Sequence, residues 1–332
     1  MRPVRTAVAG VVLGVLGLAG CGQSGDTAAP AASSAAPAAP AASAGSAAAP
    51  AASTAGSASA AFPVTVQAGN GAVTLDRRPE HIVSLSPTAT EILYAVGAGG
   101  QVAAVDDQSD YPPEAPKTSL SGFKPNLEAI VAAKPDLVVL ANDLEGVVAG
   151  LRKVGVPVLL EPAATKLDDT YDQIRDLGAA TGNAAKAEQV ADGVKQDIDR
   201  LVAAAPKGKG LTYYHELDTT PYAATSSTFI GQIYGLFGLK NIADQAPDAA
   251  GGYPKLSAEY VVKADPDLIF LADTKCCGQN AAALAKRPGW SGLSAIKAGH
   301  VVTLDDDVAS RWGPRIVDLA EAVSQAVQKA AG

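Results

Sequence analysis

The chain has 332 residues, a formal net charge of −8 and only 5% aromatic residues. This length is enough for one large core or two medium domains. Nucleic-acid binding rests on basic contacts, and the chain is acidic, with no run rich in Lys and Arg. We therefore expect no nucleic-acid partner.

The N-terminus carries the pattern of a secretory signal. Arg2 and Arg5 precede an apolar run from Ala7 to Ala19, which is shorter than the ~20 residues of a spanning helix. The run ends in LAGC, with Cys21 at the position of the lipidated cysteine of a bacterial lipobox. We predict a lipoprotein signal peptide over 1–21 and an extracytoplasmic protein anchored to the cell membrane by lipid on Cys21. An ordinary cleavage site beside a chance cysteine is the alternative.

The segment 22–61 consists almost wholly of Ala, Ser, Pro, Gly and Thr, and no large apolar side chain appears in it before Phe62. Such a composition cannot bury enough surface to offset the entropy of ordering, and frequent Pro interrupts any Ala-driven helix. We predict a disordered tether here rather than an Ala-rich helix. After Phe62 no stretch is long and apolar enough to cross a membrane, so this part is expected to be soluble.

From Phe62 onward, runs of apolar β-formers alternate with helical patterns. The expected strands cover 82–85, 102–105, 137–140, 156–160, 211–215, 268–271 and 301–304. The expected helices cover 88–96, 127–133, 144–154, 168–181, 229–237, 258–264 and 310–330. Several strands are continuously apolar, which is typical of parallel strands buried on both faces. The alternation predicts an α/β fold with parallel sheets.

An internal repeat divides this part into two similar lobes. EAIVAAKPDLVVLA at 128–141 matches EYVVKADPDLIFLA at 259–272, and each copy reads as a helix ended by Pro and followed by a buried strand. EILYAVG at 91–97 has a looser counterpart in QIYGLFG at 232–238. We predict two Rossmann-like lobes, at 62–182 and 206–332.

The segment 183–205 separates the two lobes. It has no Pro, and its apolar residues recur at the spacing of a single helical stripe. We predict one long connector helix over 183–205. Another helix inside one continuous domain is the alternative.

Apart from Cys21, the only cysteines are the adjacent Cys276 and Cys277. In an oxidising compartment they can close a vicinal disulfide, and two free thiols are the alternative. A single adjacent pair excludes a disulfide framework and gives no support to a CxxC metal site.

Loops that follow the expected strands form the predicted ligand surface, because ligands of open α/β sheets bind beyond the carboxyl ends of the strands. Thr88 can cap the helix 88–96, whose N-terminus suits an anionic group. Arg311 and Arg315, one helical turn apart, could bind a ligand carboxylate or phosphate, or a structural Asp. Aromatic residues in these loops suggest a ligand with flat or apolar faces. The candidate ligand-binding residues are Ser86, Pro87, Thr88, Tyr111, Phe123, Asn142, Tyr214, His215, Tyr222, Tyr253, Arg311, Trp312 and Arg315.

Motifs for catalysis are missing or incomplete in the sequence. There is no nucleotide-binding glycine motif and no G-x-S-x-G, and SAIK at 294–297 lacks its companion motifs. The acids at 106–107 and 305–307 leave a secreted hydrolase as an alternative. His81, His215 and His300 leave a zinc or manganese binder as another, although only His215 lies at the carboxyl end of an expected strand. We expect no catalytic residue, no cofactor and no resident metal.

Three motifs resemble the iron-siderophore/cobalamin periplasmic-binding family, and most closely its vitamin B12-binding proteins. They are RPEHIVSLSPTATEIL at 78–93, DYPP at 110–113 and NLEAIVAAKPDL at 126–137, and the resemblance extends to about residue 327. It implies two lobes joined by a single long helix, a ligand in the cleft between them, and delivery to an ABC importer. We therefore expect a monomeric solute-binding lipoprotein, not an enzyme, with a permease dimer as its partner.

The resemblance also implies roles for single residues. Glu91 and Glu259 match glutamates that lie on top of each lobe and pair with permease arginines, although ordinary exposed glutamates would look the same. Tyr253, Phe123 and Arg315 match ligand contacts of the B12-binding proteins.

Two departures from the family pattern leave the ligand open. The loop aromatics are mostly Tyr where B12-binding proteins favour Trp, and adjacent cysteines are not part of the general pattern. Ferric siderophore, cobalamin and haem are all candidate ligands. Haem would favour Tyr214 or His215 as an axial ligand.

Overall fold

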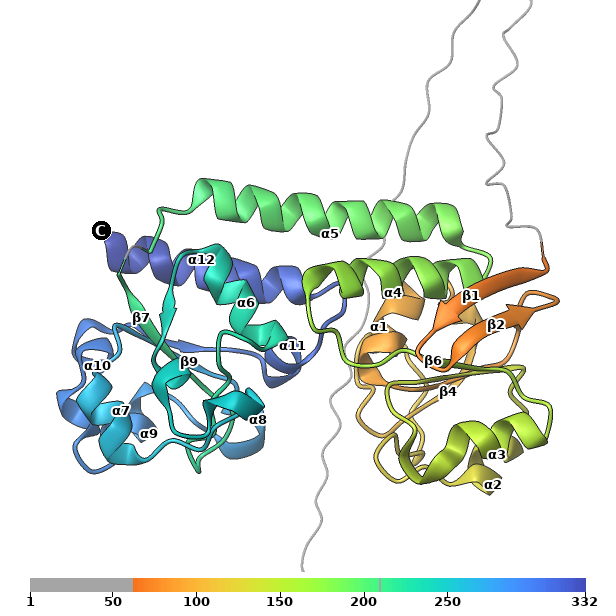
Figure 1. The fold of residues 1–332 in the computed structure, drawn as a ribbon, viewed down its shortest axis with the longest axis horizontal. Coiled ribbons are helices and arrows are strands. Elements are labelled where there is room, and N and C mark those ends of the chain that lie inside the picture. Colours follow the sequence, from red (N-terminus) through yellow and green to blue (C-terminus); the bar gives the residue numbers. More distant parts are fainter. Residues whose placement is uncertain (1–61, 209) are drawn as a thin grey trace, which may run out of the picture. The chain divides into compact units, whose positions relative to one another are not determined.

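The computed structural model describes residues 62–208 and 210–332. It contains two four-stranded parallel sheets (Figure 1). The first has the order β4-β3-β5-β6, and the second β10-β9-β7-β8. The strands are β3 (Ile82–Leu85), β4 (Val102–Val105), β5 (Leu137–Leu140), β6 (Val158–Leu160), β7 (Thr212–Glu216), β8 (Lys240–Asn241), β9 (Leu268–Leu271) and β10 (Val301–Thr303). We call the elements from β1 to α4 the N-lobe and those from β7 to α12 the C-lobe.

The central strands are apolar throughout because both faces of each sheet are covered. Every residue of β3, β5 and β9 is buried, as expected for parallel strands between helical layers. The covering helices are α1 (Pro87–Ala95), α2 (Leu127–Ala132), α3 (Val147–Lys153), α4 (Leu167–Ala180), α6 (Phe229–Leu236), α7 (Ala258–Ala264), α8 (Thr274–Cys277), α9 (Ala281–Ala285), α10 (Ser294–Ala298), α11 (Asp306–Ser310) and α12 (Ile316–Ala331). Short 3₁₀ turns are η1 (Gly99–Gln101), η2 (Leu144–Gly146), η3 (Ile242–Gln245), η4 (Ala249–Gly251) and η5 (Trp290–Gly292). The predicted α/β class with two parallel sheets is confirmed.

A single long helix, α5 (Ala184–Ala204), runs between the two lobes (Figure 1). It packs on α4 of the N-lobe and on α12 of the C-lobe. Its buried residues are Ala187, Ala191, Val194 and Ile198, all on the apolar stripe that predicted the helix.

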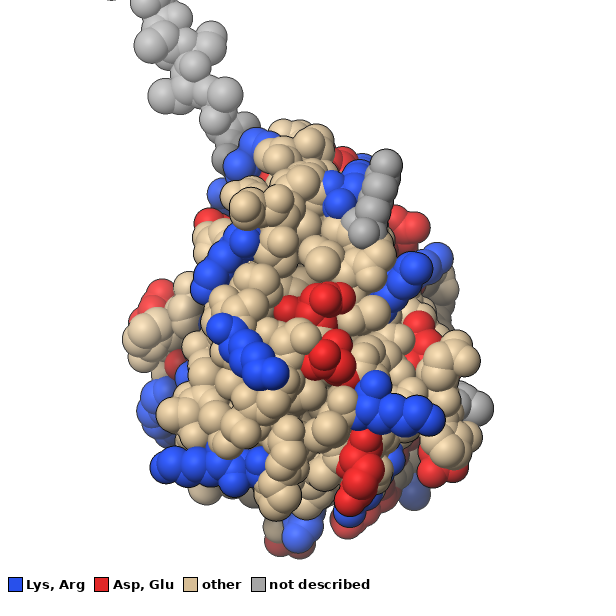
Figure 2. Space-filling model, turned by 90° about the vertical axis from the view of Figure 1, so that its left-hand side faces the viewer, with Lys and Arg blue, Asp and Glu red and all other residues tan. Residues whose placement is uncertain are grey.

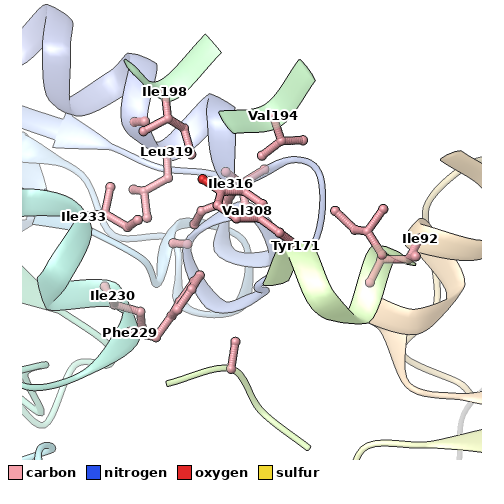
Figure 3. Packing of buried hydrophobic residues seen from close by; sticks show 14 of the residues in the cluster. Ile92, Tyr171, Val194, Ile198, Phe229, Ile230, Ile233, Val308, Ile316 and Leu319 are labelled. Carbon is pink, nitrogen blue, oxygen red and sulfur yellow. The ribbon is translucent and has the colours of Figure 1, made fainter. Parts of the chain in front are cut away.

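The lobes share one hydrophobic core beneath α5. The same cluster contains Ile92 of α1, Tyr171 of α4, Val194 of α5, and Ile316 and Leu319 of α12 (Figure 3). Because the apolar contacts continue from one lobe into the other, α5 rests on packed side chains and is not a free-standing rod.

The predicted helix 310–330 is confirmed over 316–330 but is wrong over 311–315. The chain leaves the helical path after Ser310 and re-enters it at Ile316. Gly313 and Pro314 stand in the gap, and Pro disfavours helical geometry for the residue before it. Arg311 and Arg315 therefore flank a turn and are not neighbours on one helix face.

Several further segments differ from the prediction, and the short elements β8, α8, α9 and α10 were not expected. An antiparallel hairpin of β1 (Val64–Ala68) and β2 (Gly71–Leu75) opens the N-lobe and was not predicted. The start of the expected helix 144–154 is the 3₁₀ turn η2, with Glu145 at φ 58°, a left-handed conformation that no α-helix contains.

The signal peptide 1–21 with Cys21, and the tether 22–61, lie outside the described residues. Within 62–208 and 210–332, no helix combines the length and the apolar character needed to cross a membrane. Figure 2 shows basic and acidic side chains interspersed over the outer face of the C-lobe, so this face carries no continuous basic surface.

We predict that Gly178→Ala destabilises the junction of α4 and α5. A Cβ at Gly178 would lie 2.0 Å from the Cβ of Ala187, so the helices must separate, at a cost of about 1–3 kcal/mol. Gly193→Ala on α5 is the matched control, because its Cβ meets nothing within 4 Å and replacing a mid-helix Gly stabilises by roughly 0.5–1 kcal/mol. Urea unfolding followed by circular dichroism measures both. Equal effects of the two substitutions would contradict this account of the packing.

Candidate functional site

A cavity of about 350 Å³ lies between the carboxyl ends of the N-lobe strands and the α11 region of the C-lobe. We call it the inter-lobe cavity. Its lining residues are Leu85, Ser86, Pro87, Thr88, Asp106, Gln108, Gly122, Phe123, Ala141, Asn142, Asp307, Ser310, Arg311 and Trp312. Seven of the predicted ligand-binding residues are among them: Ser86, Pro87, Thr88, Phe123, Asn142, Arg311 and Trp312.

The N-lobe wall of this cavity is built from strand ends and one helix start. Ser86, not the expected Thr88, caps α1, and its hydroxyl accepts from the Ala89 amide at 3.3 Å. Pro87 occupies the first helical position, where its missing N–H costs nothing. Phe123 projects from the wall with 68% of its surface exposed. The Oδ1 atom of Asn142 is buried and has no hydrogen-bond partner.

Glu91 of α1 lies at the centre of an ion cluster between the lobes. Its Oε1 accepts from Arg311 Nη1 at 2.8 Å and from Arg315 Nη2 at 2.6 Å, and its Oε2 accepts from Arg315 Nε at 3.0 Å. The Glu91 side chain is only 2% exposed. Both arginines belong to the turn between α11 and α12, so this cluster joins the N-lobe to the C-lobe.

Arg311 has three more partners around the same guanidinium. Its Nη2 atom donates to Asp307 at 2.7 Å, to Asp110 at 3.0 Å and to the Gln108 carbonyl at 2.8 Å. Among the lining residues of the inter-lobe cavity, all in the described part, Arg311 is the one base and Asp106 and Asp307 are acids. The cavity therefore offers an anionic ligand no guanidinium that is free of carboxylates.

Asp106 is the second acid of the cavity wall. It follows β4, is 2% exposed and accepts a hydrogen bond from the Ser109 hydroxyl. Burial raises the pKa of its carboxyl above the usual value.

Arg315, the second arginine of the ion cluster, also lies over the ring of Tyr111, with the guanidinium carbon 4.1 Å from the ring centroid. This guanidinium therefore has an aromatic partner in addition to Glu91.

Tyr222 is exposed at the surface of the C-lobe, whereas Tyr214 is buried inside it. Tyr222 directly neighbours the carboxyl end of β7, because the Leu217 amide donates to its carbonyl at 2.9 Å. It is 40% exposed, and Tyr253 on the adjoining loop is 51% exposed. Neither of these tyrosines lines the inter-lobe cavity.

Tyr214 and His215 were predicted to bind ligand, and this is wrong. Both are 0% exposed within the C-lobe. The Tyr214 hydroxyl donates to Glu216 at 3.0 Å, and His215 Nδ1 is 2.7 Å from the Tyr234 hydroxyl. Burial lowers the pKa of His215 to about 4, so the ring is neutral at pH 7. Neither side chain can serve as an axial haem ligand from this position.

The expectation that Glu91 faces a permease on the outside of the N-lobe is also wrong, because its carboxylate is buried against two arginines of its own chain. Glu259, the other predicted docking residue, is exposed in the first turn of α7. Its counterpart in the internal repeat is Glu128, which is exposed in the first turn of α2. The internal repeat aligns Glu128 with Glu259, so Glu128 could have been predicted from the sequence as the matching residue of the N-lobe.

Two of the acids behind the hydrolase alternative have structural partners. Asp305 caps α11, and Asp306 accepts from three amides of α8. No group of three or more His, Cys, Asp or Glu side chains within 62–208 and 210–332 is arranged to hold a metal ion. His81, His215 and His300 are not brought together.

Two buried carboxyls at strand ends were not singled out from the sequence. Burial, together with Asp176, raises the pKa of Glu161 after β6 to about 8. Burial, together with Glu216, raises the pKa of Asp273 after β9 to about 7. Each carboxyl lies within two residues of the end of an apolar strand, and this position is the sequence signal that could have identified it.

Comparison with known proteins gives consistent matches. A family model described as periplasmic binding protein matches residues 82–308. The ABC transporter substrate-binding lipoprotein YvrC of Bacillus subtilis is 32% identical over 279 residues, covering 80% of this chain and 86% of the relative. The cobalamin-binding protein of Halobacterium salinarum is 32% identical over 269 residues, covering 78% of this chain and 72% of the relative. The solved periplasmic heme-binding protein RhuT from Roseiflexus sp. RS-1 is 26% identical with a TM-score of 0.67, covering 76% of this chain and 100% of that protein.

We predict that Glu91→Ala lowers the free energy of unfolding by about 3–5 kcal/mol, because it leaves two partly buried arginines without their shared partner. Glu188→Ala is the matched control, since it removes an exposed partner of Arg175 and should cost less than about 1 kcal/mol. Urea unfolding measures both. A Glu91→Ala loss no larger than that of the control would show that the cluster does not hold the lobes together.

Proposed function

We propose that this chain, which belongs to the periplasmic binding protein family, captures a neutral or cationic metal chelate of the corrinoid class between its lobes and presents it to an ABC importer. One relative is named as a substrate-binding lipoprotein of an ABC transporter and another as a cobalamin-binding protein, and neither is named as an enzyme. We further propose anchoring by lipid on Cys21, with 22–61 as the tether and 183–205 as the segment between the domains.

The commitment of Arg311 and Arg315 to carboxylates is the observation that carries the ligand class. A ligand with several negative charges would be buried beside Asp106 and Asp307 without a free guanidinium in the cavity wall, which is costly. Cobalamin and ferric trihydroxamates carry little or no negative charge. Haem carries two propionates and catecholate siderophores carry more, so both are disfavoured.

Exposed aromatic rings favour a corrinoid over a compact polar chelate. Phe123 on the N-lobe side and Tyr222 and Tyr253 on the C-lobe side each expose 40% or more of their surface. A cavity of about 350 Å³ is at the small end of the range for ligand pockets. A macrocycle would therefore lie partly outside it, with its apolar faces against these rings.

The internal repeat supports a pair of equivalent docking sites for a two-fold symmetric permease. Glu128 and Glu259 each occupy the second helical position, after the side-chain caps Asn126 and Ser257. Val131 and Val262 lie one turn further along, and each is 36% exposed. Each lobe would thus present one carboxylate and one apolar side chain to the partner.

The docking residues are close in sequence to the exposed aromatic residues. Phe123 precedes Glu128 by five residues, and Tyr253 precedes Glu259 by six. The helix starts that carry the two glutamates follow loops at the carboxyl edge of each sheet, which is also the edge at which the inter-lobe cavity lies. A permease bound at Glu128 and Glu259 would face the mouth of the cavity.

The ligand proposal predicts that the full chain, purified in detergent, binds cyanocobalamin in titration calorimetry more tightly than haemin or a ferric catecholate. Phe123→Ala should raise the Kd for cyanocobalamin roughly five- to tenfold, through loss of ring stacking. Leu236→Ala is the control, because Leu236 is 37% exposed but does not line the cavity. Tighter binding of haemin than of cyanocobalamin would overturn the charge argument.

The docking proposal predicts that Glu128→Arg combined with Glu259→Arg lowers cobalamin uptake about tenfold or more in cells that carry the importer, because opposite charges are lost at both sites. The Kd of the purified variant for ligand should not change. Charge reversal at Glu80, which is exposed but lies outside the repeat, is the control. Unchanged uptake by the double variant would exclude these glutamates as docking residues.

A further inference from the structure

The adjacent cysteines of α8 form a disulfide in the structure. Cys276 and Cys277 are both exposed, on a four-residue helix that directly follows β9 and Asp273. Exposure makes the sulfur atoms accessible to an attacking thiolate. This pair plays no part in the ligand and docking proposals above.

Asp306 fastens α8 to the start of α11. Its carboxylate accepts from the amides of Thr274 at 2.7 Å, Lys275 at 3.0 Å and Cys276 at 2.9 Å, and from the Thr274 hydroxyl at 2.9 Å. Lys275 Nζ lies 2.8 Å from Asp305 and 2.7 Å from Asp307. All three residues from 305 to 307 therefore bind the segment that carries the disulfide.

The same acids lead directly to the inter-lobe cavity. Asp307 lines the cavity and accepts from Arg311 at 2.7 Å. Arg311 in turn donates to Glu91 of the N-lobe at 2.8 Å. A continuous chain of contacts thus connects Cys276 and Lys275 through the acids of α11 to the ion cluster between the lobes.

Arg287 anchors the segment after α8 to the buried Glu216. Gln279 accepts from Arg287 Nη2 at 2.8 Å, and Arg287 makes two hydrogen bonds to the buried Glu216. Asp273 before α8 is fully buried. Both ends of the segment are held in place. A change in backbone conformation between them would therefore alter the contacts that Asp306 and Lys275 make.

We propose that Cys276 and Cys277 form a thiol–disulfide site that sets how tightly the inter-lobe cavity holds its ligand; this inference rests on the proposed binding function. A dithiol reductant would cleave the S–S bond in two exchange steps, giving two cysteine thiols and the cyclic disulfide of the reductant. The two electrons and two protons gained by the cysteines are those lost by the dithiol.

The expected effect follows from the shortness of α8. Four residues are too few to form a stable helix by themselves, so the three amides that face Asp306 depend on the disulfide ring for their alignment. Opening the ring frees the backbone at Cys276 and weakens these charge-assisted hydrogen bonds. α11 then holds Asp307 and Arg311 less firmly, and ligand affinity falls.

The test uses the full chain in detergent. One sample is kept oxidised, and another is reduced by an immobilised dithiol that is removed before cyanocobalamin is added. Peptide mass spectrometry after alkylation of a portion verifies the state of the pair. Reduction should raise the Kd about three- to tenfold, equivalent to the loss of roughly one hydrogen bond. Cys276→Ser with Cys277→Ser should show the raised Kd under both conditions.

Asp306→Asn tests the route, because it should raise the Kd and remove the response to reduction. An unchanged Kd in fully reduced wild-type protein would overturn the proposal. If the oxidised chain binds no chelate, the proposed function fails, and amide hydrogen exchange then decides the inference separately. Reduction should accelerate exchange at 274–276 and at 308–311, and unaltered exchange there would overturn it.

Discussion

The ion cluster of Glu91 with Arg311 and Arg315 is the constraint on which the arrangement of the two lobes depends. A carboxylate this deeply buried is costly unless charged donors satisfy it. Here both donors come from the turn at Gly313 and Pro314 in the other lobe. The Glu91 carboxylate therefore has its hydrogen-bond donors only when the C-lobe is in place. The lobes are thus joined by the shared apolar core below α5 and by this ion cluster. Hydrogen bonds in the cluster are directional, so they fix the relative positions of the lobes more closely than apolar contacts do.

The same cluster decides what kind of ligand the cavity suits. Two arginines beside a cavity ordinarily indicate an anionic ligand. Because their hydrogen bonds go to Glu91, Asp110 and Asp307, the cavity presents neutralised charge and exposed rings. Ligand selection would then rest on shape and apolar area, and negative charge on the ligand would count against it.

Periodicity and repetition predicted the scaffold because they report directly on burial. Continuous apolar strands and one stripe on α5 identified both sheets and the connector. Sequence reasoning failed where partners distant in the chain decide the outcome. Tyr214 and His215 were expected near the carboxyl end of the strand 211–215, but β7 continues to Glu216 and both side chains are buried in the C-lobe core. Glu91 could not be recognised as buried, because its partners lie 220 and 224 residues away. The turn at Gly313 and Pro314 did have a sequence signal, because a Gly-Pro pair disfavours a helix, but the helical pattern of the following residues outweighed it.

The repeat also shows how one scaffold serves two different tasks. Its helix starts are alike, with a capped first turn and a glutamate in the second position, which suits equivalent contacts with a symmetric partner. Its strand ends diverge: β5 leads into the kinked turn η2, whereas β9 leads into α8 with its disulfide. A docking surface gains from symmetry, but a cavity for one asymmetric ligand does not. The divergence falls at the carboxyl ends of these strands, and it places the proposed thiol–disulfide site in only one of the two lobes.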